Sequence, residues 1–470
     1  MSSRPTEELT LPPVRRVPAS AVRQALTGAR QVAVLDDDPT GTQTVRDLPV
    51  LTRWTVEDIR WALRRGRAGF FVLTNTRSLA PDAAAARDRE VAEACLAAAE
   101  LEGVRLAFAS RSDSTLRGHF PLETDVLTEV VAQHGQTVDG VLLAPAYVDA
   151  GRVTIGGVHW LRTAEGLTPA ADSEFARDAT FGYRSSRLAE WVEEKSGGRI
   201  TRGDVAELTL DVIRPGTDET VAARLTDTRD GRVVVLDADE DDDLRATVLG
   251  ILAAEAGGKS FLYRVGPSFV RARVGQDAQP PIDDDTLARL VGPGHGLVVV
   301  GSHVGLTTRQ LDHLARQRRF TTVELDVPTL LDETRAEQHL RDAVTTATEA
   351  LAETLVVLST SRTLVTGDDE AHSLEIARRV SAALTRAAGE IVAARRPSYV
   401  VGKGGITSSD VATGALGIDR AWIRGSLLPG IVSLWEPASG PAQGLPYVVF
   451  AGNVGGETSL TEVIERLETA

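Results

Sequence analysis

Short apolar runs alternate with longer Ala-rich runs along most of this 470-residue chain. The apolar runs have the length of buried strands, and the runs between them have the spacing of helices. Strands that alternate with helices predict parallel sheets joined by helical crossovers. The expected fold class is therefore α/β, with two α/β domains that each contain a mostly parallel sheet.

The expected strands are the following ranges: 31–35, 69–74, 104–110, 140–144, 232–238, 260–265, 297–300, 321–325, 354–358, 399–401 and 448–451. The clearest expected helices are 19–29, 54–65, 81–102, 186–195, 244–256 and 370–394. Residues 148–196 are less regular and predict an excursion from the sheet. The polar, Pro-paired stretch 274–281 is the best candidate for a linker. We therefore expect a flexible lead over 1–18, a first domain over 19–274 and a second domain over 275–470.

Three carboxylates, Asp36, Asp37 and Asp38, directly follow the first expected strand and precede a Pro-Thr-Gly turn. In α/β proteins, the carboxyl ends of strands commonly carry the chemistry. Adjacent acids in a partly closed site repel one another, and desolvation disfavours their ionisation. A cationic partner is therefore expected, either a metal ion or an arginine. The alternative is that one Asp caps the next segment while the others face water.

Arginines recur in the loops that follow neighbouring strands. Arg77 follows the strand 69–74, Arg111 and Arg117 follow the strand 104–110, and Arg152 lies in a Gly-containing stretch beyond 140–144. The planar guanidinium suits a carboxylate or a phosphate ligand. The loops after these strands should share one edge of a sheet. Ion pairing with the Asp triplet or with Asp113 is the alternative to ligand binding.

Three Gly-rich junctions, 301–307, 402–409 and 452–458, each follow a strand and open a helix in the second half of the chain. Backbone N–H groups and hydroxyls at such junctions favour phosphate. One junction alone is typical of a tight turn, whereas three in one domain favour a phosphate site. Together with an acidic, Arg-bearing first domain, they predict phosphoryl transfer. The active site is expected in the interdomain cleft, where closure would exclude water.

A net charge of −15 argues against nucleic acid or an anionic membrane as the main partner. No apolar run reaches the length of a membrane span, and the polar N-terminus lacks a secretory signal, so we expect a cytoplasmic protein. Cys95 lies in an Ala-rich run and is expected to be buried. The acidic run 237–243 is expected to form solvated helix caps.

On these motifs, the chain resembles the four-carbon acid sugar kinase family, which includes threonate, erythronate and 3-oxo-tetronate kinases. The family's Asp-Asp-x-Thr-Gly turn corresponds to residues 37–41, its Asp-Ser-Thr-x-Arg-Gly loop to 113–118, and its Pro-Ala-x-x-x-x-Gly-Arg segment to 145–152. Further along, Gly-Ser-x-x-x-x-Thr corresponds to 301–307, Gly-Gly-x-Thr to 404–407, and Gly-Asn-x-Gly to 452–455. The motifs occur in family order over nearly the whole chain.

The resemblance implies an ATP-dependent kinase that phosphorylates a hydroxyl of a small sugar acid, with ATP and Mg²⁺ as cofactors and no assigned metal ligands. The first domain would bind the sugar acid, and the second would bind the nucleotide without a P-loop. Asp37 is the first choice of general base and Asp38 the second. The implied substrate-binding residues are Arg77, Ser112, Asp113, Ser114, Thr115, Arg117 and Arg152. The implied ATP-binding residues are Ser302, Gly404, Gly405, Ile406, Thr407, Gly452 and Gly455.

Four residues depart from the family pattern, namely the added acid Asp36, then Pro39, Thr44 and His119. All four lie near the implied substrate site, so the identity of the sugar acid stays open. One alternative is a catalytically inactive regulatory protein of the same fold that binds a sugar acid or nucleotide. Another is an NAD-dependent or nucleotide-sugar enzyme, against which the lack of a well-placed dinucleotide fingerprint argues. A homodimer is left open.

Overall fold

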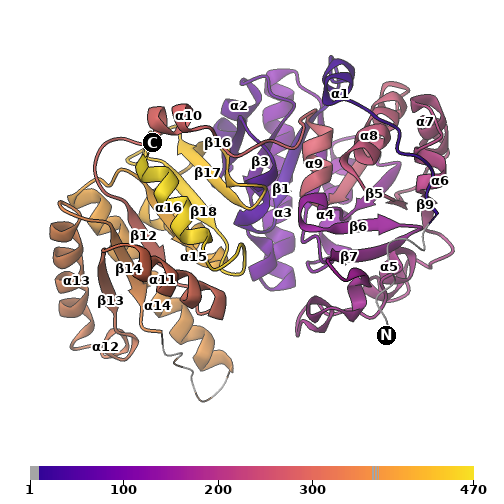
Figure 1. The fold of residues 1–470 in the computed structure, drawn as a ribbon. Coiled ribbons are helices and arrows are strands. Elements are labelled where there is room, and N and C mark those ends of the chain that lie inside the picture. The colour runs from indigo at the N-terminus through magenta and orange to yellow at the C-terminus, as the bar shows by residue number, and fades with distance from the viewer. Residues whose placement is uncertain (1–9, 363–364, 366–367, 369, 470) are drawn as a thin grey trace. The chain divides into compact units, whose positions relative to one another are not determined.

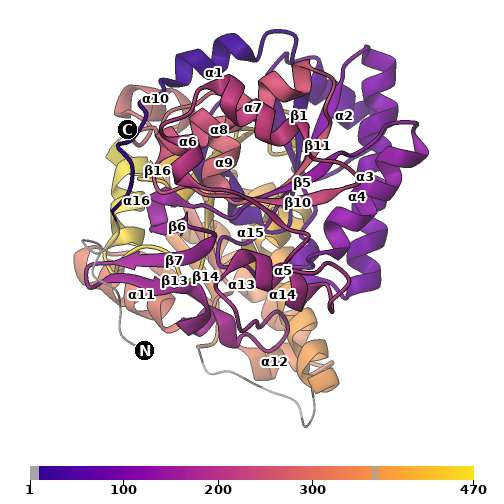
Figure 2. The same ribbon diagram turned by 90° about the vertical axis from the view of Figure 1, so that its right-hand side faces the viewer.

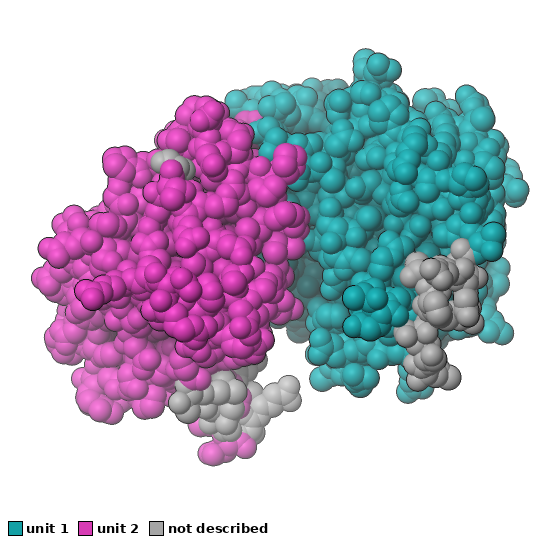
Figure 3. Space-filling model, viewed as in Figure 1, with its two compact units in different colours: residues 1–279 teal, residues 280–470 magenta. Residues whose placement is uncertain are grey.

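The computed structural model describes residues 10–362, 365, 368 and 370–469. The chain divides into two compact units, Met1–Gln279 (unit 1) and Pro280–Ala470 (unit 2), which are coloured separately in Figure 3. The division falls within the stretch 274–281 in which the sequence places a linker. Each unit contains its own run of hydrogen-bonded strands with helices packed around it (Figure 1). The expected α/β class, with mostly parallel sheets, is confirmed.

Unit 1 is built on parallel strands in the order β2-β3-β1-β4-β11-β5-β10-β9. These strands are β1 (Gln31–Asp36), β2 (Leu48–Leu51), β3 (Gly69–Leu73), β4 (Leu106–Arg111), β5 (Gly140–Ala144), β9 (Ala206–Leu208), β10 (Arg232–Leu236) and β11 (Phe261–Val265). Strand β11 is the last to appear in the chain, yet it lies between β4 and β5. Most of these strands are buried along their length, as expected for a sheet covered on both faces.

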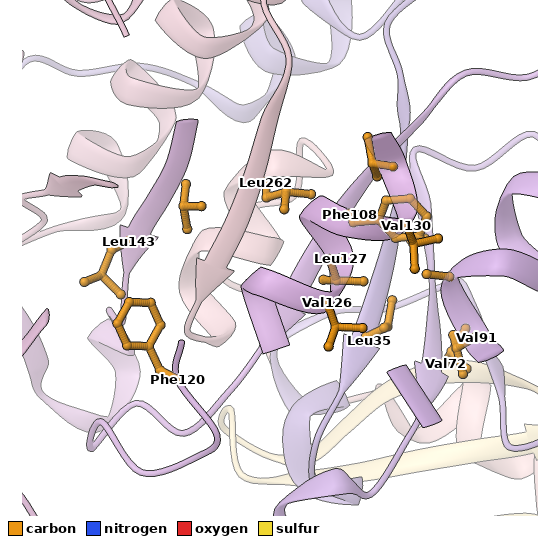
Figure 4. Packing of buried hydrophobic residues seen from close by; sticks show 14 of the residues in the cluster. Leu35, Val72, Val91, Phe108, Phe120, Val126, Leu127, Val130, Leu143 and Leu262 are labelled. Carbon is orange, nitrogen blue, oxygen red and sulfur yellow. The ribbon is translucent and has the colours of Figure 1, made fainter. Parts of the chain in front are cut away.

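The α-helices of unit 1 are α1 (Ala19–Ala25), α2 (Val56–Leu63), α3 (Pro81–Glu102), α4 (Leu122–Gln133), α5 (Leu188–Lys195), α6 (Leu210–Ile213), α7 (Asp218–Thr226), α8 (Asp241–Ala256) and α9 (Pro267–Arg273). Local sequence sets several of their ends. Pro81 occupies the first turn of α3, where no N–H is needed, and Gly103 ends that helix with φ 64°. A core joins the sheet to these helices, and Figure 4 shows Leu35 and Phe108 of the strands near Val91, Leu127 and Val130 of α3 and α4.

The predicted excursion forms a small antiparallel sheet that the sequence did not predict. Its strands are β6 (Arg152–Ile155), β7 (Val158–Thr163) and β8 (Gly166–Pro169), and Figure 2 shows part of it. The turn between β6 and β7 is Gly156-Gly157, with φ values of 58° and 71°. Two consecutive positive φ angles suit the tightest hairpin turns, and glycine adopts them without strain.

Unit 2 has the strand order β13-β14-β12-β15-β18-β17-β16. Its strands are β12 (Leu297–Val300), β13 (Thr321–Leu325), β14 (Val356–Thr360), β15 (Val400–Lys403), β16 (Arg420–Leu428), β17 (Val432–Pro437) and β18 (Tyr447–Phe450). Strands β16 and β17 are antiparallel and were not predicted. The helices are α10 (Asp284–Leu290), α11 (Gly305–Gln317), α12 (Val327–Leu331), α13 (Ala336–Ala350), α14 (Glu370–Ala394), α15 (Gly405–Asp410), a π-helix (Val411–Ala415) and α16 (Ser459–Thr469).

The predicted flexible lead over 1–18 lies partly outside the described residues, which begin at residue 10. Residues 10–18 contain no helix or strand, but they contact α7 and α8. Arg15 pairs with Asp218 at 2.5 Å, and the backbone N–H of Val17 donates to Asp242 at 2.8 Å. None of the helices in the described ranges is long and apolar enough to cross a membrane.

The expectation that the acidic run 237–243 forms solvated caps is wrong for most of its members. Asp237 is 1 % exposed and accepts the N–H groups of Gly156 and Gly157. Arg214, itself buried, pairs with Asp239 and Asp243. The capping part of the expectation holds, because Asp243 contributes to a capping box at the start of α8. Long-range partners that the sequence pattern does not show bury this run.

Candidate active site

The carboxyl ends of β3, β1, β4 and β11 lie side by side in unit 1. Asp36 at the end of β1 is opposite Leu73 of β3 and Arg111 of β4, and Arg111 is in turn opposite Val265 of β11. The loops that follow these strands therefore leave the sheet at one edge. They carry the Asp triplet, Arg77 and the loop that begins at Ser112.

Asp37 is held by a two-pronged ion pair with Arg77. The Arg77 Nε donates to Asp37 Oδ2 at 3.0 Å, and Nη2 donates to Oδ1 at 2.5 Å. The Asp37 side chain is 4 % exposed. Burial raises the pKa of Asp37 to about 7, against the lowering influence of the Arg77 charge. A carboxyl group that titrates near neutrality is suited to accept a proton from a substrate.

Asp36, the acid that the family pattern lacks, is the ion-pair partner of Arg111. Arg111 Nη2 also donates to the carbonyl oxygen of Asp38 at 2.6 Å. A Cβ atom on Gly41 would overlap the Arg111 guanidinium, so the glycine of the Pro-Thr-Gly turn leaves room for this arginine. Burial lowers the pKa of Arg111 to about 10. Among the described residues, the buried atoms Asp36 Oδ2 and Arg111 Nε have no hydrogen-bond partner.

Asp38 caps the turn that follows it. Its Oδ1 accepts the backbone N–H of Thr40 at 2.9 Å, and its Oδ2 lies 3.4 Å from Nη1 of Arg77. The side chain of Asp38 is 24 % exposed, more than those of Asp36 and Asp37. The capping alternative thus describes Asp38, while its two neighbours are buried beside arginines.

The Asp113 loop forms a second charged group at the same edge. Arg117 Nε donates to Asp113 Oδ2 at 2.6 Å, and the Thr115 hydroxyl donates to the same carboxylate oxygen. Burial acts to raise the pKa of Asp113, but the charges of Arg77 and Arg117 outweigh it, and the pKa is held below its ordinary value. Asp113 therefore stays ionised at neutral pH. Its neighbour Ser114 accepts a hydrogen bond from His159 Nε2 at its carbonyl oxygen, at 2.7 Å.

Two charged residues at this edge were missed by the sequence analysis, Glu123 and Arg264. Glu123 Oε2 accepts the hydroxyls of Ser110 and Ser112 at 2.7 and 2.9 Å. Arg264 is fully buried and lies 3.9 Å from Glu123. An arginine near the end of an apolar strand, as at Arg264, was the available signal. Glu123 gave none, because an acid in the first turn of a helix is ordinary.

Three arginines surround Asp113, namely Arg111 and Arg264, which are buried, and Arg152, which is half-buried. The negative charge of Asp113 raises the pKa of each, but burial is the larger influence in all three, and each pKa is lowered. Each arginine also has a buried N–H group without a partner among the described residues: Nε of Arg111, Nε of Arg152, and both Nε and Nη1 of Arg264. Buried donors are nearly always hydrogen-bonded, so these groups fit an anionic or hydroxyl-bearing ligand.

In unit 2, the predicted glycine junctions come together. Strands β12, β15 and β18 are neighbours, and the loops after them carry Ser302, Gly404 and Gly452. Thr307 Oγ1 donates to the Gly452 carbonyl oxygen at 3.0 Å and lies within hydrogen-bond distance of Ser302 Oγ, at 3.1 Å. Gly404 has φ 128°, and a Cβ there would lie 2.9 Å from the Thr407 hydroxyl oxygen. The glycines therefore allow hydroxyls from neighbouring loops to approach the backbone closely.

Gly405, Ile406 and Gly455 occupy different places in these loops. Gly405 and Ile406 begin α15. Gly455, with φ 84°, lies in the loop before α16 and packs against the Ser459 hydroxyl.

Two cations beside these loops were not predicted. Lys403 Nζ donates to the Ala451 carbonyl oxygen at 2.7 Å and lies 3.7 Å from the centre of the Phe450 ring. Burial lowers the pKa of Lys403 to about 7. Arg362 donates to the Ser302 carbonyl oxygen at 2.6 Å, and its buried Nε has no partner among the described residues. Both residues stand at or just after strand ends, which is the signal that could have identified them.

The residues that the structure describes contain no group of three or more His, Cys, Asp or Glu side chains placed to hold a metal ion. Mg²⁺ in phosphotransferases commonly takes only one or two carboxylates and completes its shell with phosphate oxygens and water. Asp36 and Asp38 fit this smaller requirement best in unit 1, because Asp36 Oδ2 has no partner and Asp38 is partly exposed. The donor set thus suits a cation that arrives with a phosphate ligand.

Comparison with known families matches the two parts of the chain separately. Residues 32–273 match the model of a sugar-binding N-terminal domain, and residues 297–460 match that of a nucleotide-binding C-terminal domain. These domains pair an acid- and arginine-lined sheet edge with glycine-rich strand ends, as described above for units 1 and 2. The chain belongs to the four-carbon acid sugar kinase family.

Three characterised relatives carry kinase names. D-Erythronate kinase of Heliobacterium modesticaldum is 28 % identical over 279 residues, which cover 57 % of this chain but only 55 % of that enzyme. D-Threonate kinase of Salmonella typhimurium is 26 % identical over 368 residues, covering 76 % of this chain and 79 % of that enzyme. 3-Oxo-isoapionate kinase of Paraburkholderia graminis is 31 % identical over 173 residues, covering 34 % of this chain and 36 % of that enzyme.

Two solved structures share the fold. A Salmonella typhimurium LT2 protein has a TM-score of 0.67 at 19 % identity and covers 92 % of this chain and 98 % of its own. Haemophilus influenzae protein HI1011 has a TM-score of 0.60 at 16 % identity, covering 93 % and 99 %. Identities this low establish the shared fold alone.

Proposed function

We propose that this protein transfers the terminal phosphoryl group of ATP to a hydroxyl of a small, four-carbon sugar acid. The observation that carries the proposal is the group of buried arginine N–H donors without partners around Asp113, next to a buried aspartate whose pKa is about 7. A sugar acid offers one carboxylate and several hydroxyls, so it matches donors and a proton acceptor together. The kinase names of the relatives support the same class of reaction.

Asp37 is the proposed general base. Each carboxylate oxygen can accept more than one hydrogen bond, so Asp37 can receive a substrate hydroxyl while it stays paired with Arg77. Arg77 fixes the orientation of the carboxylate and retains its own charge, since the nearby acids raise its pKa against the effect of burial. As the acceptor oxygen attacks phosphorus, its proton moves to Asp37. Asp38 is the weaker candidate for the general base because its Oδ1 already accepts the backbone N–H of Thr40.

The carboxylate of the substrate would bind the unpaired donors of Arg111, Arg152 and Arg264. The substrate roles proposed for Ser112, Asp113, Thr115 and Arg117 divide into two kinds, whereas Ser114 is buried and its carbonyl oxygen binds His159. The hydroxyls of Ser112 and Thr115 already bind Glu123 and Asp113, so these two residues mainly position other groups. Asp113 and Arg117 are partly exposed and can meet sugar hydroxyls directly.

ATP would bind to the glycine loops of unit 2. Ser302, Thr407, Gly404 and Gly452 would provide hydroxyl and backbone groups, Arg362 would provide positive charge beside them, and Lys403 would provide a further N–H donor. Mg²⁺ bound to the ATP phosphates would neutralise the charge that develops during transfer. The proposal requires the phosphoryl donor of unit 2 to reach the acceptor held by unit 1.

The proposal is tested by measuring ADP release with ATP, Mg²⁺ and a panel of four-carbon sugar acids, including erythronate and threonate. Substrate-dependent ADP release from at least one acid, abolished in Asp37→Asn, is expected. ATP turnover with none of the acids would overturn the kinase assignment, and an undiminished rate for Asp37→Asn would overturn the assigned base.

The alternative of a catalytically inactive regulatory protein draws on the departures at Pro39 and Thr44. In the structure, Pro39 starts a 3₁₀ turn, and the Thr44 hydroxyl donates to the Pro267 carbonyl oxygen at 3.2 Å. Both residues therefore help to set the conformation of the turn Pro39–Thr44 that follows the Asp triplet. Tight binding of a sugar acid without ATP turnover would favour this alternative.

A further inference from the structure

A cavity of about 630 Å³ lies in unit 1 at the amino-terminal ends of β1, β2 and β3, whereas the Asp triplet begins at the carboxyl end of β1. Gln31, the first residue of β1, and Leu48, the first residue of β2, both line the cavity. Strand β1 separates Gln31 from Asp36 by about 17 Å, at the usual rise of about 3.3 Å per residue. The cavity is therefore distinct from the candidate active site of unit 1.

Positive charge is concentrated around this cavity. Four arginines line it, Arg23, Arg30, Arg46 and Arg67, and Asp47 is the single acidic residue among its described lining residues. The chain as a whole has a net charge of −15, so its composition does not account for this local excess of arginine. Arginine binds carboxylate and phosphate groups through paired N–H donors. The charge of the cavity therefore suits an anionic ligand.

Arginines near helix C-termini often only complement the helix dipole. This explanation applies to Arg23, which lies in the last turn of α1 and donates to the Gly275 carbonyl oxygen at 2.8 Å. It does not apply to Arg46, which lies between the turn Pro39–Thr44 and β2. The Nε of Arg46 is buried and has no hydrogen-bond partner among the described residues. Buried donors are nearly always hydrogen-bonded, so this N–H group indicates a ligand.

Gln31 adds an unused acceptor to the same cavity. Its Oε1 atom is buried and also lacks a partner in the described ranges. An amide oxygen accepts hydrogen bonds, and a ligand hydroxyl is a suitable donor. The volume of the cavity falls within the range of about 300–1,000 Å³ that is usual for small-molecule sites. The cavity thus combines cationic donors, one free acceptor and room for a small ligand.

We propose that this cavity binds a small organic anion that carries at least two anionic groups and a hydroxyl, such as a hydroxy-dicarboxylate or a phosphorylated hydroxy acid. The anionic groups would pair with Arg46 and the neighbouring arginines, and the hydroxyl would donate to Gln31. This is a second ligand site in unit 1, in addition to the proposed site of the sugar acid.

The walls of the cavity connect it to the Asp triplet. The Gln276 side chain accepts the backbone N–H of Arg46 at 3.0 Å and donates to the Arg46 carbonyl oxygen at 2.8 Å. Arg46 follows the turn Pro39–Thr44, and Gln276 follows α9, in which the Pro267 carbonyl oxygen accepts the Thr44 hydroxyl. An anion bound to Arg46 would therefore restrain the turn that follows the Asp triplet. Through that turn, its binding should change the KM for the sugar acid, an effect that rests on the proposed function.

Hydrogen-exchange mass spectrometry of the full chain at low salt tests the site. Malate and 3-phosphoglycerate are the two probes, and at least one of them should slow exchange in the peptides 45–48 and 274–279. The probe concentration that gives half-maximal protection of these peptides measures the affinity of this cavity alone. Arg46→Met removes the unpaired donor and keeps the backbone contacts with Gln276, so it should raise this concentration by about tenfold to a hundredfold.

Arg65→Met is the matched control. Arg65 is an exposed arginine close in sequence to Arg67, but it stacks over Trp61 and is not among the residues that line the cavity. Its substitution should leave the protection of both peptides at the wild-type level. Protection by neither probe in wild type, or equal protection in wild type and Arg46→Met, would overturn the proposal.

The melting temperature separates a ligand-binding role of Arg46 from a structural one. Since its Nε has no partner among the described residues, Arg46→Met should melt at or above the wild-type temperature when no anion is present. The anion should raise the melting temperature of wild type and not that of Arg46→Met. An equal rise in both proteins would contradict binding at Arg46.

Succinate, which is malate without its hydroxyl, tests the contact with Gln31. Wild type should require more succinate than malate for half-maximal protection of the peptides 45–48 and 274–279. Gln31→Leu should remove most of this difference. Equal affinities of wild type for the two acids would overturn the hydroxyl contact.

The outcomes separate this inference from the proposed function. If a probe protects the cavity but no sugar acid is phosphorylated, the kinase proposal fails and the anion site stands. If a sugar acid is phosphorylated and no probe protects the cavity, the kinase proposal stands and the anion site fails. In an active kinase, a saturating probe should change the KM for the sugar acid in wild type and not in Arg46→Met, and an unchanged KM in wild type would overturn the connection to the Asp triplet.

Discussion

Unit 1 contains two acidic runs that follow strands, residues 36–38 after β1 and residues 237–243 after β10. Both runs contain buried carboxylates and both contact buried arginines. Asp237 and Asp37 also share a raised pKa, about 6 and about 7, with burial as the main cause. Acidity, burial and a shifted pKa therefore fail to separate the two runs.

The two runs differ in whether their buried polar atoms have hydrogen-bond partners. In the run 237–243, Asp237 accepts the backbone N–H groups of Gly156, Gly157 and Leu210 at 2.7, 2.9 and 3.2 Å. Arg214 binds both Asp239 and Asp243. None of these side chains has a buried polar atom without a partner in the described ranges.

Beside the run 36–38, in contrast, Asp36, Arg111 and Arg264 each have at least one such atom. In this comparison, unpartnered buried polar atoms distinguish the two runs, whereas acidity, burial and a shifted pKa do not.

Among substitutions in the two acidic runs, Asp37→Asn is expected to have the largest effect, and that effect is on kcat. An amide cannot accept the substrate proton as a carboxylate does, so kcat should fall by about 10²- to 10⁴-fold. The amide oxygen can still face Arg77, so the melting temperature should change little. Steady-state ADP release and thermal unfolding check the two parts. If Asp37→Asn lost its folded structure together with its activity, the role of Asp37 would be structural, like that of the run 237–243.

Arg214→Met should instead reduce the stability of the folded protein. The substitution leaves Asp239 and Asp243 buried without their shared cation, which should cost about 3–5 kcal/mol of unfolding free energy. Urea unfolding monitored by circular dichroism measures the loss. Arg199→Met is the control, because Arg199 pairs with Asp125 at an exposed position and should cost about 1 kcal/mol or less. Similar losses in the two variants would contradict the structural role of the run.

Asp237→Asn should give a smaller, purely structural effect. The Asn amide group would place donors against the backbone N–H groups of Gly156 or Gly157, leaving about 1–3 kcal/mol of unsatisfied hydrogen bonding. Unfolding free energy should fall by this amount, while kcat at a temperature well below unfolding should stay within about twofold of wild type. A kcat loss as large as that of Asp37→Asn would contradict the purely structural role of Asp237.

The two runs can also be compared through the pH dependence of activity and stability. The pKa of Asp37 rises from 3.8 to about 7 in the folded protein, so kcat/KM should increase as pH rises through about 7, as the base loses its proton. Because the raised pKa favours the protonated form in the folded state, its contribution to stability is complete below about 3.8 and is lost as pH rises through about 7. Asp37→Asn should therefore lose less stability than wild type between pH 4 and 8.

Thermal scans of both proteins across this pH range measure the difference in stability. Parallel curves for wild type and Asp37→Asn would contradict the raised pKa.

Much of the fold could be predicted because its strands are local apolar runs with clear ends. The ranges 140–144 and 297–300 coincide with β5 and β12, and 81–102 coincides with α3. The antiparallel pair β16 and β17 was missed, because alternating polar and apolar residues over a few positions give a weak signal.

The site was predictable where residues follow strands and not where distant packing sets their role. Arg77, Asp113 and Arg117 follow predicted strands, and the structure brings them to one edge of the sheet. Glu123 is defined by the hydroxyls it accepts from Ser110 and Ser112. Partners far along the chain bury the run 237–243: the Val17 N–H, 225 residues from Asp242, is one of them.

The position of β11 has a consequence for the order in which the molecule can be completed. The strand is formed by Phe261–Val265 but lies between β4 and β5, whose residues are made more than a hundred positions earlier. During synthesis, the facing edges of β4 and β5 have no partner until β11 has left the ribosome. Because Arg264 is on that strand, an unfinished chain also lacks one of the three arginines around Asp113. A nascent chain of unit 1 should therefore complete its sheet only after residue 265 emerges, and the proposed sugar-acid binding should appear only afterwards.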